Sequence, residues 1–299
     1  MFLILAHSTD ETAYRVQEAL RKRHGVAAAR LLTIEELTCA TVWTHSHAKR
    51  QIHTNLCLSD GTQLSSKNIA AVFNRLRYVT MPQFTTAKIV DREYAVMEMH
   101  ALLLSWLESL SCTVVNAPDT RGLSGAERSL AGWLQLAGEA GLPTRGLHFT
   151  TNARRFPNSE YEPHLPSSVN HNDATTHALR AVSRLTLGGS PAIFLEPIEA
   201  AQQQQRALVI GEKVCGNISP RLKDGCLRLA RLGNYNLLEC FFARSIVTEH
   251  MLDKETCGQV LCGATHFPNI SVVAEIEMIA DLLQQPRLTP RTNEESSAL

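Results

Sequence analysis

One stretch of the chain, residues 70–118, restricts the possible folds more than any other. The apolar run at 69–74 predicts a buried strand, the pattern at 90–109 predicts a long helix, and the run at 112–115 predicts a second buried strand. A strand, a helix and a strand in this order are typical of a parallel sheet that carries helices on its faces. Asn116-Ala117-Pro118 closes the stretch.

The N-terminal residues repeat this alternation. The apolar run at 2–6 predicts a first strand, a helical pattern follows it up to Gly25, and residues 26–32 are a candidate second strand. Residues 33–68 contain short apolar runs around a Ser-Asp-Gly turn, which indicates a hairpin with polar outer faces. We therefore expect an α/β fold whose first half is an open, mostly parallel sheet.

The predicted helix at 90–109 carries a stripe of apolar side chains at helical spacing. The stripe consists of Val90, Tyr94, Met97, Ala101, Leu104 and Leu107. An apolar stripe of this kind normally packs against the rest of the protein. We expect it to lie on the sheet.

Composition excludes several classes of partner. The 29 basic residues balance the 29 acidic residues, so no net charge attracts nucleic acid or an anionic membrane. The apolar runs are far shorter than the roughly 20 residues of a membrane-spanning helix. The first residues, MFLILAHSTDET, lack the basic region and cleavage site of a signal peptide. We expect a cytoplasmic protein without nucleic-acid or membrane partners.

The cysteines and histidines give weak signals for metal. The eight cysteines include no CxxC pair, and free thiols are the better interpretation in a chain without an export signal. Cys257, Cys262 and His266 allow a metal clip, but no fourth ligand follows at structural-zinc spacing. His45 and His47 share one face of the predicted hairpin, where surface histidines remain the favoured interpretation. We expect core thiols and no zinc site.

The second half of the chain divides into shorter elements. Residues 152–169 read as loop, residues 272–283 as a last helix, and residues 286–299 as a disordered tail. Four apolar runs between the loop and the last helix predict strands, at 192–198, 206–210, 236–243 and 259–264.

Four sequence blocks follow one another along the chain in an order that points to a known family. They are Asn74-Arg75 with 91–95 and 114–118, Trp133 with 140–144, 192–198 with 206–214, and 237–242 with 260–264. In this order the chain resembles the ATP-grasp ligases, above all the RimK-like and graspetide-type peptide ligases with an N-terminal sheet domain. An unrelated α/β protein with similar strand spacing is the alternative.

The resemblance implies an ATP-grasp-like architecture in three parts. An N-terminal α/β domain covers 1–120, a reduced central segment covers 121–195, and a C-terminal segment covers 196–285. The strand that ends at Ile198 is expected beside the strand at 207–214, and their separation into different sheets would rule out the resemblance altogether. Prolines at 157, 163 and 166 predict a loop-rich lid, reduced in size, at 151–190.

The resemblance also assigns roles to six residues. Leu195, Glu196 and Ile198 are implied at the adenine-binding hinge, and Arg206 is implied against phosphate as the catalytic residue. Glu239 and Asn269 are the implied ligands of Mg²⁺, which prefers oxygen. A strand-end arginine and a solvent-facing glutamate are the plainer interpretations of Arg206 and Glu196.

The chain departs from the family pattern where the family handles phosphate and metal. No lysine occurs between Lys88 and Lys213, although the family uses two lysines there on the nucleotide phosphates. The glycine-rich flap is reduced to Gly188-Gly189, and the terminal Glu-x-Asn-x-Pro motif is replaced by residues 263–269. The nucleotide and metal motifs are therefore degenerate.

Two functions follow from this pattern. The favoured one is a degenerate ATP-grasp-fold protein that acts as a binding or partner subunit in a biosynthetic or peptide-modification pathway, with no cofactor. The alternative is an ATP-dependent carboxylate-amine ligase that uses ATP and Mg²⁺ and works through an acyl phosphate. The expected partners are a peptide or small carboxylate substrate and a partner enzyme.

Overall fold

The computed structural model describes residues 1–48, 51–150, 162–164, 192–198, 204–245 and 258–285, which fall into two compact units. The first unit contains Met1–Glu127, Asn234–Leu237 and the chain from His266 onward. The second contains Arg128–Gly233 and Leu238–Thr265. The division into three segments, drawn from the sequence, remains a prediction.

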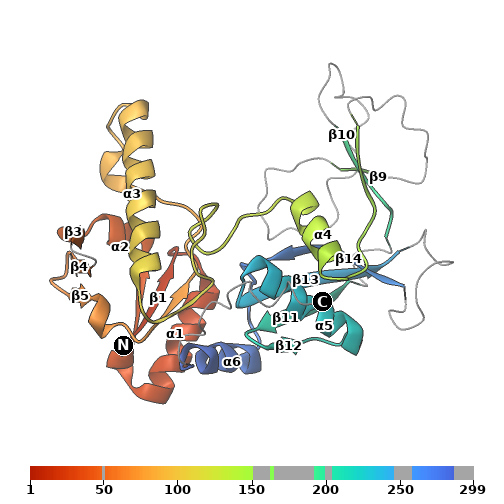
Figure 1. Ribbon diagram of the computed structural model, residues 1–299. Coiled ribbons are helices and arrows are strands. Elements are labelled where there is room, and N and C mark those ends of the chain that lie inside the picture. Colours follow the sequence, from red (N-terminus) through yellow and green to blue (C-terminus); the bar gives the residue numbers. More distant parts are fainter. Residues whose placement is uncertain (49–50, 151–161, 165–191, 199–203, 246–257, 286–299) are drawn as a thin grey trace. The chain divides into compact units, whose positions relative to one another are not determined.

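A four-stranded parallel sheet forms the centre of the first unit (Figure 1). Its strands, in spatial order, are β2 (Ala29–Thr33), β1 (Phe2–Ala6), β6 (Ala71–Asn74) and β7 (Thr113–Val115). Leu3, Ile4 and Leu5 are fully buried, because both faces of β1 are covered. The α/β class and the parallel sheet that the sequence predicts are confirmed.

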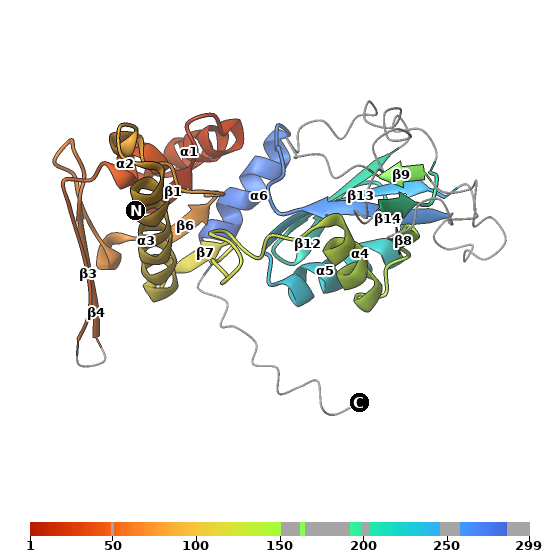
Figure 2. The same cartoon turned by 90° about the horizontal axis from the view of Figure 1, so that it is seen from above.

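Helices cover both faces of this sheet (Figure 2). On one face lies α3 (Ile89–Ser109). On the other face lie α1 (Glu11–His24) and α6 (Val273–Leu283), which pack against each other. Asp10 caps α1, because its carboxylate accepts a hydrogen bond from the N–H of Ala13 at 3.2 Å. A short helix, α2 (Ile34–Thr38), follows β2 directly.

The prediction that the apolar stripe of α3 is buried is wrong for most of the stripe. Val90, Tyr94 and Met97 are 74%, 65% and 69% exposed. The helix buries Leu103 and Trp106, which are outside the stripe, together with Leu107, which belongs to it. Only the C-terminal half of α3 packs on the sheet, so the apolar spacing of the N-terminal half does not report a core contact.

An antiparallel hairpin sheet is inserted between β2 and β6. It consists of β3 (Val42–Ala48), β4 (Gln51–Cys57) and β5 (Gln63–Ser65). His45 joins this sheet to α3: Nδ1 lies 2.7 Å from the hydroxyl of Thr54, and Nε2 lies 2.9 Å from the hydroxyl of Ser105. Both ring nitrogens are thus engaged in protein contacts, which supports a structural role for His45.

The second unit contains two antiparallel sheets and two helices. Its elements are α4 (Leu130–Glu139), β8 (Leu147–Thr150), β9 (Glu162–His164), β10 (Ala192–Leu195), β11 (Gln205–Ile210), β12 (Lys213–Cys215), α5 (Pro220–Gly233), β13 (Leu237–Arg244) and β14 (Gln259–Thr265). The larger sheet has the order β12-β11-β13-β14, and α4 and α5 pack on it. The smaller sheet has the order β8-β10-β9.

The sequence predicts that the strand ending at Ile198 lies beside the strand at 207–214, and this prediction is wrong. β10 belongs to the smaller sheet and β11 to the larger one. Ile198 forms a single antiparallel bridge with Ser245, which directly follows β13. The chain therefore reaches the larger sheet through β13, which stands between β11 and β14.

The predicted lid lies largely outside the described residues, at 151–161 and 165–191. The described part contains β9, where Pro163 pairs with Phe194 of β10. β9 is an edge strand of its sheet, the position in which a residue without an N–H donor is tolerated. No helix among the described residues has the length and hydrophobicity to cross a membrane.

Seven cysteines lie in the described ranges, and no disulfide joins any two of them; Cys257 lies outside these ranges. Burial raises the pKa of Cys262 to about 11. A hydrogen bond with Cys226, followed by burial, raises the pKa of Cys240. Cys39 is exposed.

These environments predict selective alkylation of the native protein. At pH 8 only about one Cys262 thiol in a thousand is a thiolate, the form that reacts. Iodoacetamide is therefore expected to modify Cys39 well before Cys262 or Cys240, as peptide mass mapping would show. Equal labelling in urea is the control, and equal labelling of the native protein would contradict the burial of Cys262.

Candidate functional site

Arg206 and Glu239, both expected as site residues, form an ion pair in the second unit. Arg206 lies in β11 and Glu239 in the neighbouring β13. The Nε–H of Arg206 donates to Oε1 of Glu239. The Glu239 side chain is 8% exposed and that of Arg206 is 33% exposed. The structure therefore joins the residue assigned to phosphate with the residue assigned to metal.

This ion pair explains why a carboxylate can stay charged in the larger sheet. An ionised carboxylate that leaves water without a partner pays a large desolvation penalty, which pairing and hydrogen bonding offset. Arg206 supplies the opposite charge to Glu239 across adjacent strands. In this structure the guanidinium of Arg206 and the carboxylate of Glu239 are therefore engaged with each other.

Glu196 fastens the end of β10 to the segment before β8. Its Oε2 accepts a hydrogen bond from the N–H of Gly146 at 2.9 Å, and its own N–H donates to the Gly146 carbonyl at 3.0 Å. The Nε–H of Arg145 donates to the Glu196 carbonyl oxygen. A Cβ at position 146 would lie 2.5 Å from Cδ of Glu196, so this contact favours glycine. The carboxylate is folded onto protein backbone.

The other two hinge residues lie in the same short segment. Leu195 ends β10 and is buried, at 4% exposure. Ile198 is half-buried and bridges Ser245. Sequence reasoning did not single out Arg145 or Gly146, since nothing in the local pattern links them to a residue 50 positions away. Their pairing arises from the contact between β8 and β10.

Asn269 belongs to the first unit, whereas Glu239 belongs to the second. Asn269 is exposed and follows His266, which is buried and stacks on Tyr235 with ring centroids 5.1 Å apart. His266 is thus packed against an aromatic ring of its own unit. The carbonyl of His266 accepts a hydrogen bond from Asn116 at 3.0 Å.

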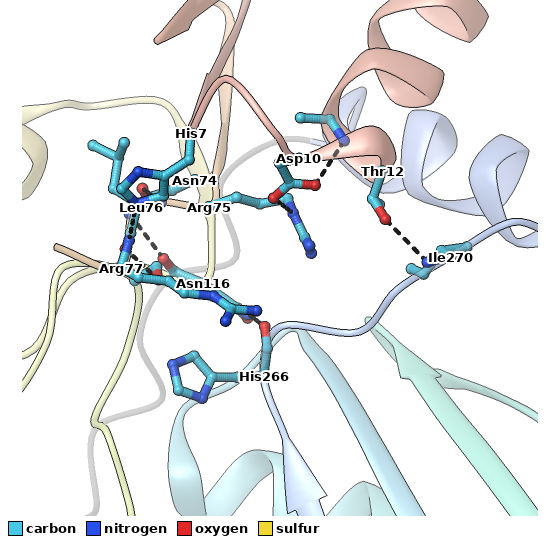
Figure 3. A network of polar contacts seen from close by, with 12 residues as sticks. His7, Asp10, Thr12, Asn74, Arg75, Leu76, Arg77, Asn116, His266 and Ile270 are labelled. Atoms are coloured by element: carbon cyan, nitrogen blue, oxygen red, sulfur yellow. Dashed lines mark hydrogen bonds and ion pairs between the residues drawn. The ribbon is translucent and has the colours of Figure 1, made fainter. Parts of the chain in front are cut away.

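Asn116 holds these returning segments to the parallel sheet. Its Oδ1 accepts from the N–H groups of Asn236 and Leu237, at 3.1 and 3.0 Å. Its Nδ2 donates to the carbonyls of Leu237 and His266, both at 3.0 Å. Figure 3 shows Asn116 close to His266 and below the end of β6. The sequence placed Asn116 after a strand, and its hydrogen bonds to chain 120 and 150 positions away were not foreseen.

The described residues do not by themselves provide a donor set that fits Mg²⁺. This ion takes about six oxygen ligands at about 2.0–2.1 Å in near-octahedral geometry. Within the described ranges no three His, Cys, Asp or Glu side chains converge. The buried carboxylate of Glu239 is occupied by the Arg206 guanidinium. No lysine lies between positions 88 and 213 to neutralise a triphosphate.

No protein-family model and no curated protein matches the sequence. Solved structures do match. A RiPP-associated ATP-grasp ligase from Chryseobacterium gregarium, in complex with ADP and a leader and core peptide, has a TM-score of 0.66 at 15% identity, and the match covers 96% of this chain and 97% of that one. The macrocyclase MdnC from Microcystis aeruginosa, bound with the precursor peptide MdnA, has a TM-score of 0.70 at 16% identity, covering 94% and 98%.

A RimK domain ATP-grasp protein from Sphaerobacter thermophilus also matches, with a TM-score of 0.51 at 13% identity over 95% of this chain and 100% of that one. Similarity at this level of identity establishes the fold. The ATP-grasp resemblance is thereby confirmed for the fold, although β10 and β11 lie in separate sheets. Adjacency of the strand ending at Ile198 and the strand at 207–214 is therefore not required for this fold.

Proposed function

Because the chain has the ATP-grasp fold, we propose that it binds a peptide and does not catalyse ligation. It would serve as a binding or partner subunit of a peptide-modifying enzyme in the cytoplasm. The observation that carries this proposal is the ion pair between Arg206 and Glu239, in which the residue implied for phosphate and the residue implied for metal engage each other.

Acyl-phosphate chemistry depends on positive charge. A carboxylate attacks the γ-phosphate, and the charge that develops on the phosphoryl oxygens must be stabilised by cations that are already in place. In this chain the region between Lys88 and Lys213 supplies no ammonium group. The guanidinium of Arg206 already donates to a buried carboxylate. The site therefore supports binding better than phosphoryl transfer.

The peptide part of the proposal rests on the matched structures. The Chryseobacterium ligase is in complex with a leader and core peptide, MdnC is bound with MdnA, and PsnB is complexed with a minimal precursor. The three matches cover at least 94% of this chain. Because the fold of these peptide-bound proteins extends over nearly the whole chain, we propose that this chain also binds a peptide.

An ATP-dependent peptide ligase is the second candidate. The nearly complete coverage of ligase structures, one of them with Mg and ADP, favours it. In that reaction a substrate carboxylate attacks the γ-phosphate, ADP leaves, and an amine displaces phosphate from the acyl phosphate. Arg206 would face phosphate, Glu239 and Asn269 would bind Mg²⁺, and Leu195, Glu196 and Ile198 would border adenine.

The two candidates differ in their response to nucleotide. Each missing phosphate contact removes a charge-assisted hydrogen bond of about 1.5–3 kcal/mol, so two missing lysines weaken binding about a hundredfold or more. Millimolar Mg-ATP is expected to leave the melting temperature unchanged, and Arg206→Ala is expected not to alter residual binding. Micromolar affinity by calorimetry that is lost in both Arg206→Ala and Glu239→Ala would contradict the first candidate and favour the ligase.

Peptide binding is tested separately with a random peptide display library, selected on the full chain without nucleotide. Enrichment of a shared motif supports the proposal. Failure to enrich any motif would contradict it, and ADP formation when the same library is supplied with Mg-ATP would favour the ligase. A selection on the protein unfolded in urea is the control for adhesion to exposed apolar residues.

A further inference from the structure

A second group of charged side chains lies in the first unit, at the carboxyl ends of β1 and β6. His7 and Asp10 follow β1, and Arg75 and Arg77 follow β6 (Figure 3). β1 and β6 are adjacent and parallel, so the residues that follow them meet at one edge of the sheet. This edge is where open α/β sheets bind ligands.

Arg75 is buried there with part of its hydrogen-bonding capacity unused. Its side chain is 5% exposed, and its Nε–H donates to Oδ2 of Asp10 at 2.6 Å. Its Nη1 is buried and has no hydrogen-bond partner among the described residues. A buried donor on a charged group without a partner is unfavourable, and native proteins rarely leave one unexplained. An acceptor from a ligand would satisfy it.

Arg77 places a second guanidinium close by. Its Cζ lies 4.3 Å from the ring centroid of Phe267, which fixes the group by a cation–π contact. Loss of hydration, followed by the positive charge of Arg75, lowers the pKa of Arg77. Two adjacent cations repel each other, and an anion between them would relieve this repulsion.

His7 adds a neutral donor at the same edge. Its Nε2 accepts a hydrogen bond from the backbone N–H of Arg77 at 3.2 Å, so the proton of the neutral ring resides on Nδ1. Burial lowers the pKa of His7, which keeps the imidazole neutral at pH 7. The ring of Tyr78 lies 4.2 Å from that of His7, centroid to centroid, and orients it.

We propose that His7, Arg75 and Arg77 bind a carboxylate of the peptide ligand, a role that rests on the proposed function. A guanidinium matches the two oxygens of a carboxylate with parallel hydrogen bonds. Asp10, Glu35 and Glu127 also act electrostatically on this cluster. The acidic surroundings favour a ligand with a single negative charge over a phosphate dianion.

The test uses the full chain and follows the side-chain Nε–Hε signals of arginine by NMR. Sodium acetate is expected to move the signals of Arg75 and Arg77, and inorganic phosphate at the same concentration is expected to move them less. A capped Gly-Glu-Gly-Glu-Gly peptide is expected to bind about ten- to a hundredfold more tightly than its glutamine counterpart. Arg77→Met should remove this difference.

Arg121→Met is the matched control, because Arg121 is an exposed arginine of the same unit that pairs with Asp119. Arg75→Lys, which keeps the charge and loses the fork, is a second variant and should also reduce binding of the glutamate peptide. Stronger shifts with phosphate than with acetate would overturn the carboxylate assignment. So would glutamate and glutamine peptides that bind equally to the wild type and to Arg77→Met.

The outcomes separate this inference from the proposed function. Peptides from the display library that bind Arg77→Met as tightly as the wild type would contradict the carboxylate site and leave peptide binding intact. Acetate shifts that depend on Arg77, combined with a library selection that fails, would support the anion site and contradict the peptide proposal.

Discussion

Asp10→Ala is expected to destabilise the protein by about 4–6 kcal/mol, since it removes the partner of a buried cation and the cap of a helix. Arg75 is 5% exposed and donates to Asp10 at 2.6 Å, so its charge would remain buried without a counter-ion. The N–H of Ala13 would lose its acceptor as well. The measurement is urea denaturation of the full chain, read by hydrogen exchange of β1.

Three further variants separate these causes. Asp10→Asn keeps a capping side chain and loses the charge, so it should be less damaging than alanine. The double variant Asp10→Ala with Arg75→Met removes both charges and should recover part of the lost stability. Asp281→Ala, at an exposed ion pair with Arg23, should change stability by at most about 1 kcal/mol. Equal losses for Asp10→Ala and Asp281→Ala would refute the buried pair.

Asn116→Ala is expected to cost about 4 kcal/mol or more, because it deprives four backbone groups of their partners at about 1–3 kcal/mol for each buried group. Those groups belong to Asn236, Leu237 and His266. The returning segments would then detach from the sheet at a lower denaturant concentration. Hydrogen exchange at Leu237, read by mass spectrometry, would show faster opening of this segment.

Asn234 provides the matched control for this variant. Both asparagines have positive φ angles, 54° for Asn116 and 58° for Asn234, so alanine meets the same backbone strain at either position. Asn234 is exposed, whereas Asn116 is 2% exposed. Asn234→Ala is expected to cost about 1 kcal/mol. If the two substitutions were equally harmful, the hydrogen bonds of Asn116 would not be the cause.

The parallel sheet could be predicted because its strands are short apolar runs next to clear turns. β1, β6 and β7 lie where the sequence places them, and α3 begins one residue from its predicted start. The buried face of α3 could not be predicted, because apolar residues recur at helical spacing both on the face that meets the sheet and on the face that does not. Exposure of Tyr94 and Met97 depends on how far α3 extends past the sheet.

The sequence names individual candidate residues, whose roles remain predictions, and it does not reveal how these residues pair. Arg206 and Glu239 were singled out for separate roles, whereas their ion pair depends on β11 and β13 being neighbours although they are 33 residues apart. Glu196 was expected at a hinge, and its bond to Gly146 requires the pairing of β8 with β10. Strand order is a property of the whole sheet and leaves little trace in local patterns.

The first unit is built from separate stretches of chain, and this has a consequence for biosynthesis. α6 packs against α1 and the sheet, but the whole second unit is translated between β7 and α6. During that interval the nascent sheet lacks α6, whose buried side chains include Ile276 and Ile279. The second unit can complete its own pairing while the first one waits. We therefore expect the N-terminal sheet to complete its packing only after α6 has been synthesised.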